Sequence, residues 1–573
     1  MTDSTAQPGH TVAGATDRTP EPNADVCVVG AGVAGGLVAH RLAERGYSVV
    51  VLEAGPRFDT STEALLARME KAIRPEHSIQ DVWEAGIDPD RDAFTASVPD
   101  GSRCRLNDYR LKGVGGSTLH WDAEVPRLHE KDFEMRSRYG LAADWPIDYG
   151  DLRPYYAAAE TELGVAGGGD NPFVPREEPP PMAAHPSTAV EGRFVAACER
   201  LGIRTHSTPR AINSEAYDGR SECVGYGTCN PVCPSGARYS GDVHIRKAEA
   251  EGARVIDRVP VQYLDHDRSG ESVTAAVYRT PEGREHRQEA DAVVVACGGI
   301  ETPRLLLLSA SETYPDGLAN SSGLVGSYLF SSVFIPAVGR VDDRTNEQPV
   351  HFGTVSSCEF YDHETPTPGS VRLESRNNAP RSLAKTALTG GEPVRELLTD
   401  PGLDSRLAEP IVGGGWGDDL IGRLEDEAAY RRVGTLAQVE VLPQQSNAVT
   451  LDDSVRDSHG NPVPHVSYDI DPHAVETGEY AIDLMTEILA EMDAEVLRTG
   501  DPTSQPLTSH HKGTTRMGAD PDRSVVDSRL RTHDLSNLWI ASSSVFPTGG
   551  AVNPTLTIAA LALKAADHID EQL

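Results

Sequence analysis

The beginning of this 573-residue chain carries a glycine-rich loop between an apolar run and a helical pattern. Residues 25–30 are apolar and β-branched, residues 33–45 have helical spacing, and residues 48–53 are again β-rich, which predicts a β-α-β unit. In the loop GAGVAG, Gly30 suits a tight turn, Gly32 the close approach of a pyrophosphate, and Gly35 the packing of helix on strand. Glu53 follows about 20 residues later, where a carboxylate can accept hydrogen bonds from a ribose. The motif predicts a dinucleotide site, does not choose between NAD and FAD, and leaves a ligand-free turn as the alternative.

Two other segments predict the wider architecture. Residues 291–299 (DAVVVACGG) read as a second buried strand that runs into the helical segment 301–310, which adds to a parallel sheet. Alternating apolar residues between 433 and 466 favour an antiparallel sheet with one covered face. A chain of this length exceeds what one core supports, so we expect an α/β Rossmann-like domain and a second, α+β domain that binds substrate.

Composition excludes some classes of partner. The formal net charge is −35, from 52 basic and 87 acidic residues, which argues against nucleic acid and anionic membranes. Only 7 of the basic residues are lysine, and an acidic, lysine-poor surface is typical of proteins from salty environments, so we expect a halophilic source. No apolar run reaches the roughly 18 residues of a membrane span, and residues 1–24 read as a disordered tail with no targeting signal. We therefore expect a cytoplasmic protein with no transmembrane segment.

Three more segments resemble the glucose-methanol-choline (GMC) oxidoreductase family, in order and at similar spacing. They are residues 111–128 (LKGVGGSTLHWDAEVPRL), 297–310 (CGGIETPRLLLLSA) and 510–566, which begins with HHKGTTRMG. The resemblance implies an FAD-dependent fold of the GMC type. It places these residues near the cofactor: Gly113, Gly115, Gly116, Ser117, the end of a strand near Val261, Ser542, Ser543, Asn553, Pro554 and Thr555. Ser542 departs from the family, which usually has an aspartate there; a hydroxyl can still hydrogen-bond the cofactor, though more weakly than a charge.

The resemblance also implies the catalytic pair. Hydride transfer from a carbinol carbon to the flavin requires a group that accepts the hydroxyl proton, and an imidazole suits this. His510 takes that role by its place in the motif, and its neighbour His511 does not. Asn553 is expected to hydrogen-bond the same substrate oxygen. The resemblance therefore predicts a dehydrogenase or oxidase of CH–OH groups.

Cys223, Cys229 and Cys233 form a cluster with C-x5-C-x3-C spacing. The surrounding segment resembles the catalytic subunit of bacterial FAD-dependent glucose dehydrogenases, in which matching cysteines hold an iron-sulfur cluster. Three thiolates suit a 3Fe-4S cluster, which would pass electrons singly to a cytochrome or quinone acceptor, and relatives imply a small subunit. The alternatives are a labile disulfide, or a zinc site with His244 as fourth ligand.

His120, in STLHW, has a counterpart in pyranose oxidases that is covalently joined to the flavin. A stacking or hydrogen-bonding role requires less special chemistry and remains the alternative.

Together these features predict a dehydrogenase of sugars or polyols. A flavin-only alcohol oxidase or dehydrogenase with structural cysteines is the second interpretation, and a non-enzymatic electron-transfer flavoprotein the third. We expect FAD-domain segments at 25–165, 236–335 and 501–573, a linker with the cysteines at 166–235, and a substrate domain at 336–500.

Overall fold

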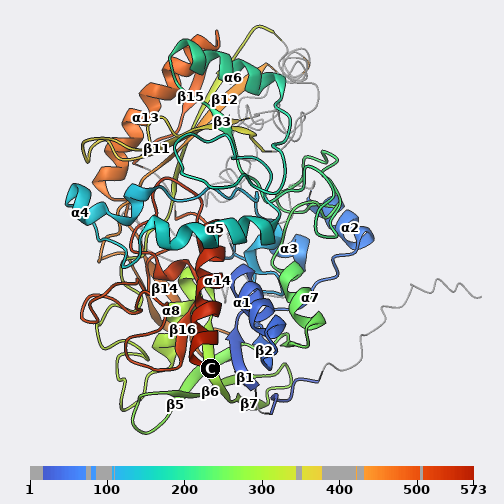
Figure 1. The fold of residues 1–573 in the computed structure, drawn as a ribbon, viewed down its shortest axis with the longest axis vertical. Helices are drawn as coiled ribbons and strands as arrows, with labels where there is room; N and C mark the ends of the chain where they lie inside the picture. Colours follow the sequence, from blue (N-terminus) through green and yellow to red (C-terminus); the bar gives the residue numbers. More distant parts are fainter. Residues whose placement is uncertain are drawn as a thin grey trace, which may run out of the picture.

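The computed structural model describes residues 17–22, 24–72, 79–84, 106–108, 110–343, 352–376, 421, 431–503 and 507–573. Most of the expected tail, residues 1–16 and 23, lies outside these ranges. Arg18, inside that tail, donates a hydrogen bond to the backbone oxygen of Asp257. Figure 1 shows two sheets at opposite ends of the molecule, with α5 (Tyr149–Leu163) running across the middle.

The lower sheet in Figure 1 is parallel and has the strand order β16-β8-β1-β2-β4. Its strands are β1 (Ala24–Val29), β2 (Val49–Leu52), β4 (Arg254–Ile256), β8 (Ala290–Val295) and β16 (Leu538–Ile540). Helix α1 (Val33–Glu44) packs against α7 (Asp242–Ala250) and α14 (Thr555–Gln572) beside this sheet. Strands covered on both faces are apolar throughout, which is why the periodicity of residues 25–53 and 291–299 predicted them correctly.

The upper sheet has six strands in the order β15-β9-β12-β11-β10-β3. They are β3 (His206–Ser207), β9 (Val333–Arg340), β10 (Val355–Ser357), β11 (Val371–Arg376), β12 (Arg432–Val439) and β15 (Glu495–Thr499). All neighbours are antiparallel, and α13 (Pro472–Glu491) packs on β9 and β12. The second domain with an antiparallel sheet is therefore confirmed.

The expectation of one sheet between residues 433 and 466 was wrong in one respect. β12 joins the six-stranded sheet, but β13 (Ala448–Arg456) and β14 (Pro462–Ser467) form a separate hairpin. The hairpin packs on α8 (Gly298–Leu308), where Arg304 forms an ion pair of 2.6 Å with Asp457 and donates to the Pro462 oxygen. Alternation shows that one face is covered, but not by which element.

A three-stranded antiparallel sheet, β5 (Val261–His266), β6 (Val273–Arg279) and β7 (Glu285–Gln288), lies against the parallel sheet. The remaining helices are α2 (Thr62–Ala72), α3 (Ile79–Trp83), α4 (Met135–Tyr139) and α6 (Ala189–Arg200). Short 3-10 helices span Leu106–Asp108, Gly116–His120, Glu130–Phe133 and Ser543–Val545. Among the described helices, none combines the length and apolar character needed to cross a membrane.

Candidate active site

A cavity of about 1190 Å³ runs from the dinucleotide loop to the six-stranded sheet. It is larger than the roughly 300–1,000 Å³ typical of a small-molecule site, so it has room for a dinucleotide and a substrate. Its wall includes Gly30, Gly32 and Glu53 at one end and Phe334, Pro336 and Leu436 of the upper sheet at the other.

The three glycines of the loop occupy three different environments. Gly30 has φ +103°, which favours glycine, and forms the turn at the end of β1. A Cβ on Gly35 would lie 1.9 Å from the Gly30 oxygen, whereas a Cβ on Gly32 would meet no atom within 4 Å. Gly35 thus permits helix packing, and Gly32 leaves space at the N-terminus of α1, where backbone N–H groups attract phosphate.

These environments predict different effects for two alanine substitutions. Gly35→Ala should destabilise the protein by about 3 kcal/mol, because the new methyl group overlaps backbone that cannot move away. Gly32→Ala should leave the melting temperature of the apoprotein unchanged and weaken FAD binding. Thermal unfolding of both apoproteins and FAD titration test this pair; equal stability of the two variants would contradict it.

Glu53 is buried, and its two carboxylate oxygens accept hydrogen bonds of 2.8 Å from the backbone N–H groups of Ala31 and Gly55. Burial raises the pKa of this carboxyl group, while the two N–H groups oppose that shift. Each carboxylate oxygen can still accept another bond. Glu53 therefore holds the loop in place and keeps acceptor capacity for a ribose.

The second glycine segment lies directly against the first. A Cβ on Gly116 would lie 3.0 Å from the Gly32 Cα, and the Gly115 N–H donates to the Ala31 oxygen at 2.8 Å. Ser117 lines the cavity and accepts a hydrogen bond from the Leu111 N–H at 3.1 Å. Gly113 and Gly116 also line it. This part of the expected cofactor site is contiguous.

His120 closes the second segment, and the structure buries it at the cavity wall. Its Nε2 is buried without a hydrogen-bond partner among the described residues, and burial lowers the pKa of the ring to about 4. A neutral, unpartnered ring nitrogen in the wall is available to a bound cofactor.

The strand expected to end near Val261 was placed wrongly. β4 ends at Ile256, and Val261 instead begins β5 of a different sheet. Pro260 and Arg258, which has φ +58°, occupy the turn between the strands. Val261 nevertheless lines the cavity.

The C-terminal segment supplies the opposite wall. Ser542, Ser543, Asn553, Pro554 and Thr555 all line the cavity, and Thr555 begins α14. The Ser542 Oγ accepts a hydrogen bond from the Ser544 N–H at 3.1 Å. The Ser543 hydroxyl donates one to the backbone oxygen of His511 at 2.6 Å. Where the family usually has a charge, this chain therefore has a hydroxyl that also caps a short local turn.

His510 lies in the same wall, near the six-stranded sheet. Its Nδ1 is 2.9 Å from the Ser332 Oγ, and its ring meets Phe334 edge-on at 5.3 Å between centroids. Burial, Lys512 and His511 hold the pKa of His510 well below its usual range, so the ring is neutral at pH 7. A neutral imidazole at a cavity wall can accept a proton.

His510 and Asn553 are joined by hydrogen bonds through the second domain. Gln438 donates from Nε2 to the Ser332 Oγ at 3.1 Å, and its Oε1 accepts from Arg372 at 3.3 Å. Arg372 also donates to the Asn553 Oδ1 at 3.4 Å, which leaves the amide N–H groups of Asn553 to donate elsewhere.

Sequence reasoning missed this supporting layer. Arg372 is buried and paired with Glu124 and Glu374, and Glu124 also forms an ion pair of 3.2 Å with Arg210. Burial raises the pKa of Glu124 to about 7. The one available signal was the alternation of charged and apolar residues in VRLE, which is unusual in a buried strand.

The cysteines lie beside this cavity. Cys223, Cys229 and Cys233 are free thiols, and the other two influence the ionisation of Cys229, whose pKa burial raises to about 12. Asn230, within the cysteine segment, lines the cavity. Arg238 donates to the backbone oxygens of Cys229, Leu119 and Trp121, so it links the cysteines to the segment that carries His120.

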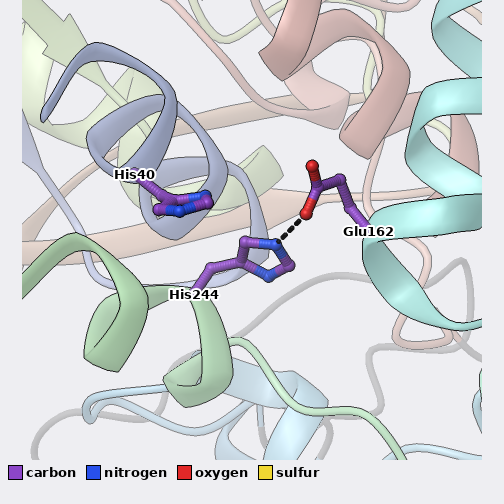
Figure 2. A group of neighbouring side chains, drawn as sticks. All are labelled: His40, Glu162 and His244. Atoms are coloured by element: carbon purple, nitrogen blue, oxygen red, sulfur yellow. Dashed lines mark hydrogen bonds and ion pairs between the residues drawn. The ribbon is translucent and has the colours of Figure 1, made fainter. Parts of the chain in front are cut away.

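The zinc alternative requires His244 to lie with the three cysteines. The structure instead places His244 in a different group of side chains. Among the described residues, the one group of three His, Cys, Asp or Glu ligand atoms within 4.8 Å of one another is His40, Glu162 and His244 (Figure 2). There the His244 Nε2 lies 3.0 Å from Glu162 and its Nδ1 2.8 Å from the Tyr239 hydroxyl. The Lys247 ammonium lies 3.7 Å from the same Glu162 oxygen. Lys247 also forms an ion pair of 2.8 Å with Asp218. Because both ring nitrogens of His244 have partners, we assign it a structural role.

Comparison with known proteins decides the family. The GMC oxidoreductase model matches residues 112–316 and 443–562, and an FAD dependent oxidoreductase model matches 25–97. The fructose dehydrogenase large subunit of Gluconobacter japonicus is 34% identical, over 96% of this chain and 98% of its own. The chain belongs to the GMC oxidoreductase family. It is an FAD-dependent enzyme.

A second relative supports this assignment, and a solved structure shares the fold. The 2-methyl-1,2-propanediol dehydrogenase of Mycolicibacterium austroafricanum is 30% identical, over 97% of this chain and 96% of its own. The crystal structure of pyridoxine 4-oxidase from Mesorbium loti has a TM-score of 0.62 at 17% identity, covering 96% and 99% of the two chains. The structural likeness shows the shared fold.

The observed cavity fits FAD. It offers the open space at Gly32, the N-termini of α1 and α14, and the unpartnered Nε2 of His120. The positive end of α14 is suited to negative charge on a reduced cofactor.

Proposed function

We propose that this enzyme oxidises a CH–OH group of a sugar or polyol and passes the electrons onward through a 3Fe-4S cluster. The observation that carries the first half is that His510 and Asn553 line the cavity that contains the dinucleotide loop, and that hydrogen bonds through Ser332, Gln438 and Arg372 join them. Relatives named for fructose and for a diol support the substrate class.

The roles of the residues follow from their states. Bound FAD supplies the hydride acceptor. His510, neutral at pH 7, accepts the hydroxyl proton, and Asn553 donates an N–H to the substrate oxygen, because Arg372 holds its Oδ1. Phe334 and Leu436 form an apolar part of the cavity wall, and Glu124 and Arg376 form a polar part. Such a wall suits a substrate that has both C–H faces and several hydroxyl groups.

The cluster is proposed on Cys223, Cys229 and Cys233. All three are free thiols in one segment, and Cys223 and Cys233 both influence the ionisation of Cys229. Three thiolates in one place suit a 3Fe-4S cluster. Val224 and Tyr226 in the same loop are 62% and 49% exposed. An exposed apolar surface beside the cluster supports docking of an electron-accepting subunit, as the words "large subunit" in one relative's name suggest.

Anaerobic reduction of the purified protein by aldoses, ketoses, polyols and simple alcohols tests the proposal. A polyhydroxylated compound should bleach the flavin and then the broader iron-sulfur absorption. Bleaching by simple alcohols alone would contradict the substrate class. Peroxide formation under air, with no iron present, would favour the flavin-only alternative.

Acid precipitation tests the covalent link to His120, because a colourless pellet means that the bond is absent.

A further inference from the structure

Lys512 is a buried cation two residues after His510, and the mechanism above does not use it. Its side chain is 1% exposed, and its Nζ lies 3.2 Å from the Ser332 Oγ and 4.9 Å from the centre of the Phe330 ring. Burial lowers the pKa of Lys512 to about 7, and Asp132 opposes that shift through space. Both protonation states of this lysine are therefore accessible near neutral pH.

Ser332 connects Lys512 to His510. Its Oγ has three neighbours, the His510 Nδ1 at 2.9 Å, the Gln438 Nε2 at 3.1 Å and the Lys512 Nζ at 3.2 Å. A hydroxyl donates one hydrogen bond and accepts two. Gln438 must be a donor here, because Arg372, which only donates, occupies its Oε1. His510 and Lys512 therefore share one donor and one acceptor position on Ser332.

This sharing couples the charge of Lys512 to the tautomer of His510. A charged Lys512 only donates, so Ser332 must donate to the His510 Nδ1, and the neutral ring then carries its proton on Nε2. A neutral Lys512 can accept from Ser332, which then accepts from the His510 Nδ1–H. Only the second arrangement leaves the Nε2 lone pair free to act as a base.

We infer that the substrate proton is relayed from His510 through Ser332 to Lys512, which is its terminal acceptor. The substrate O–H bond breaks as Nε2–H forms on His510, Nδ1–H breaks as O–H forms on Ser332, and the original Ser332 O–H breaks as N–H forms on Lys512. The hydride from the carbinol carbon carries the electron pair to the flavin. One proton has moved, and the lysine ends as an ammonium ion. The inference rests on the proposed function.

Other titratable or charged groups near the relay shift the pKa values of Lys512 and His510. Asp132, from the 3-10 helix Glu130–Phe133, favours the ammonium form of Lys512. Arg372 of β11 and His511 both lower the pKa of His510. Asp132 is also engaged, because the Tyr361 hydroxyl donates to it at 2.8 Å and Lys131 lies 3.7 Å away. Burial also raises the pKa of Asp132 to about 6 and that of Glu124, the partner of Arg372, to about 7, so the variants below assign the kinetic pKa to Lys512.

The test is the pH dependence of kcat/KM for the holoenzyme with the best substrate of the anaerobic panel. In the wild type it should rise with pH through a kinetic pKa near 7, because the neutral lysine is required. Lys512→Met should lower kcat roughly 100-fold and remove that rise. Lys512→Arg keeps the charge and should be at least as slow. A lysine that only stabilises an alkoxide predicts the reverse: activity falls with rising pH, and arginine rescues methionine.

Ser332→Ala is the second variant, because it breaks the relay and leaves Lys512 in place. It should also lose the rise near pH 7, and the proton inventory in mixtures of light and heavy water should change from curved to linear. FAD content and melting temperature of each variant establish folding. Unchanged pH profiles in Ser332→Ala and in Lys512→Met would overturn the relay while the proposed function stands. Failure of every alcohol to bleach the wild-type flavin would overturn both.

Discussion

Replacing His510 by glutamine should leave a folded, yellow protein whose turnover is lower by roughly 100-fold or more. The substitution removes the imidazole that lines the cavity and whose Nδ1 lies 2.9 Å from the Ser332 Oγ. Because the pKa of His510 lies well below its usual range, the wild-type ring is neutral at pH 7 and does not have to lose a proton before it acts. The loss should therefore appear in the rate of flavin reduction under anaerobic conditions.

His511→Gln is the matched control. His511 also lines the cavity, and its Nε2 has no hydrogen-bond partner among the described residues. Burial lowers its pKa to about 3, and its backbone oxygen accepts from Ser543. We expect a much smaller loss than for His510→Gln. An equal or larger loss would assign the base to the neighbour and contradict the role of His510.

Replacing Cys223, Cys229 and Cys233 by serine should separate reduction of the flavin by substrate from electron transfer to the acceptor. The variant should contain FAD and no iron, and sugar or polyol should still bleach its flavin. Turnover with a one-electron acceptor should nearly vanish, because a flavin that holds two electrons then has no one-electron outlet. Iron analysis, stopped-flow flavin reduction and steady-state assays measure the three quantities.

Cys198→Ala is the control for this set. Cys198 is a buried, free thiol on α6, which packs against the upper sheet and α13, so its removal should change neither iron content nor electron transfer. Full activity of the triple variant with the one-electron acceptor would contradict the cluster and favour structural cysteines.

Local pattern predicted the parallel sheet well, because strands such as β1 and β8 are buried on both faces and therefore read as continuous apolar runs. The same reasoning misplaced the β13–β14 hairpin, since alternation does not identify the covering element. Val261 was misplaced for a similar reason: a turn at Arg258 ends one sheet and begins another without interrupting the β-rich pattern.

The candidate site was predictable only where it lies within motifs. His510, Asn553 and the glycines stand in contiguous signatures, and the structure brings them to one cavity. Arg372 and Gln438, by contrast, come from strands that the sequence does not connect to those motifs, and Arg372 lies 181 residues from Asn553. Their roles depend on tertiary contacts, which no local spacing encodes.

The most direct measurement of the central claim is anaerobic flavin reduction by a sugar or polyol that carries deuterium on the oxidised carbon. The account predicts that deuterium slows bleaching in the wild type, because the carbon–hydrogen bond breaks in that step. It also predicts that His510→Gln is slow with both isotopologues. Bleaching that is indifferent to deuterium and equally fast in His510→Gln would contradict it.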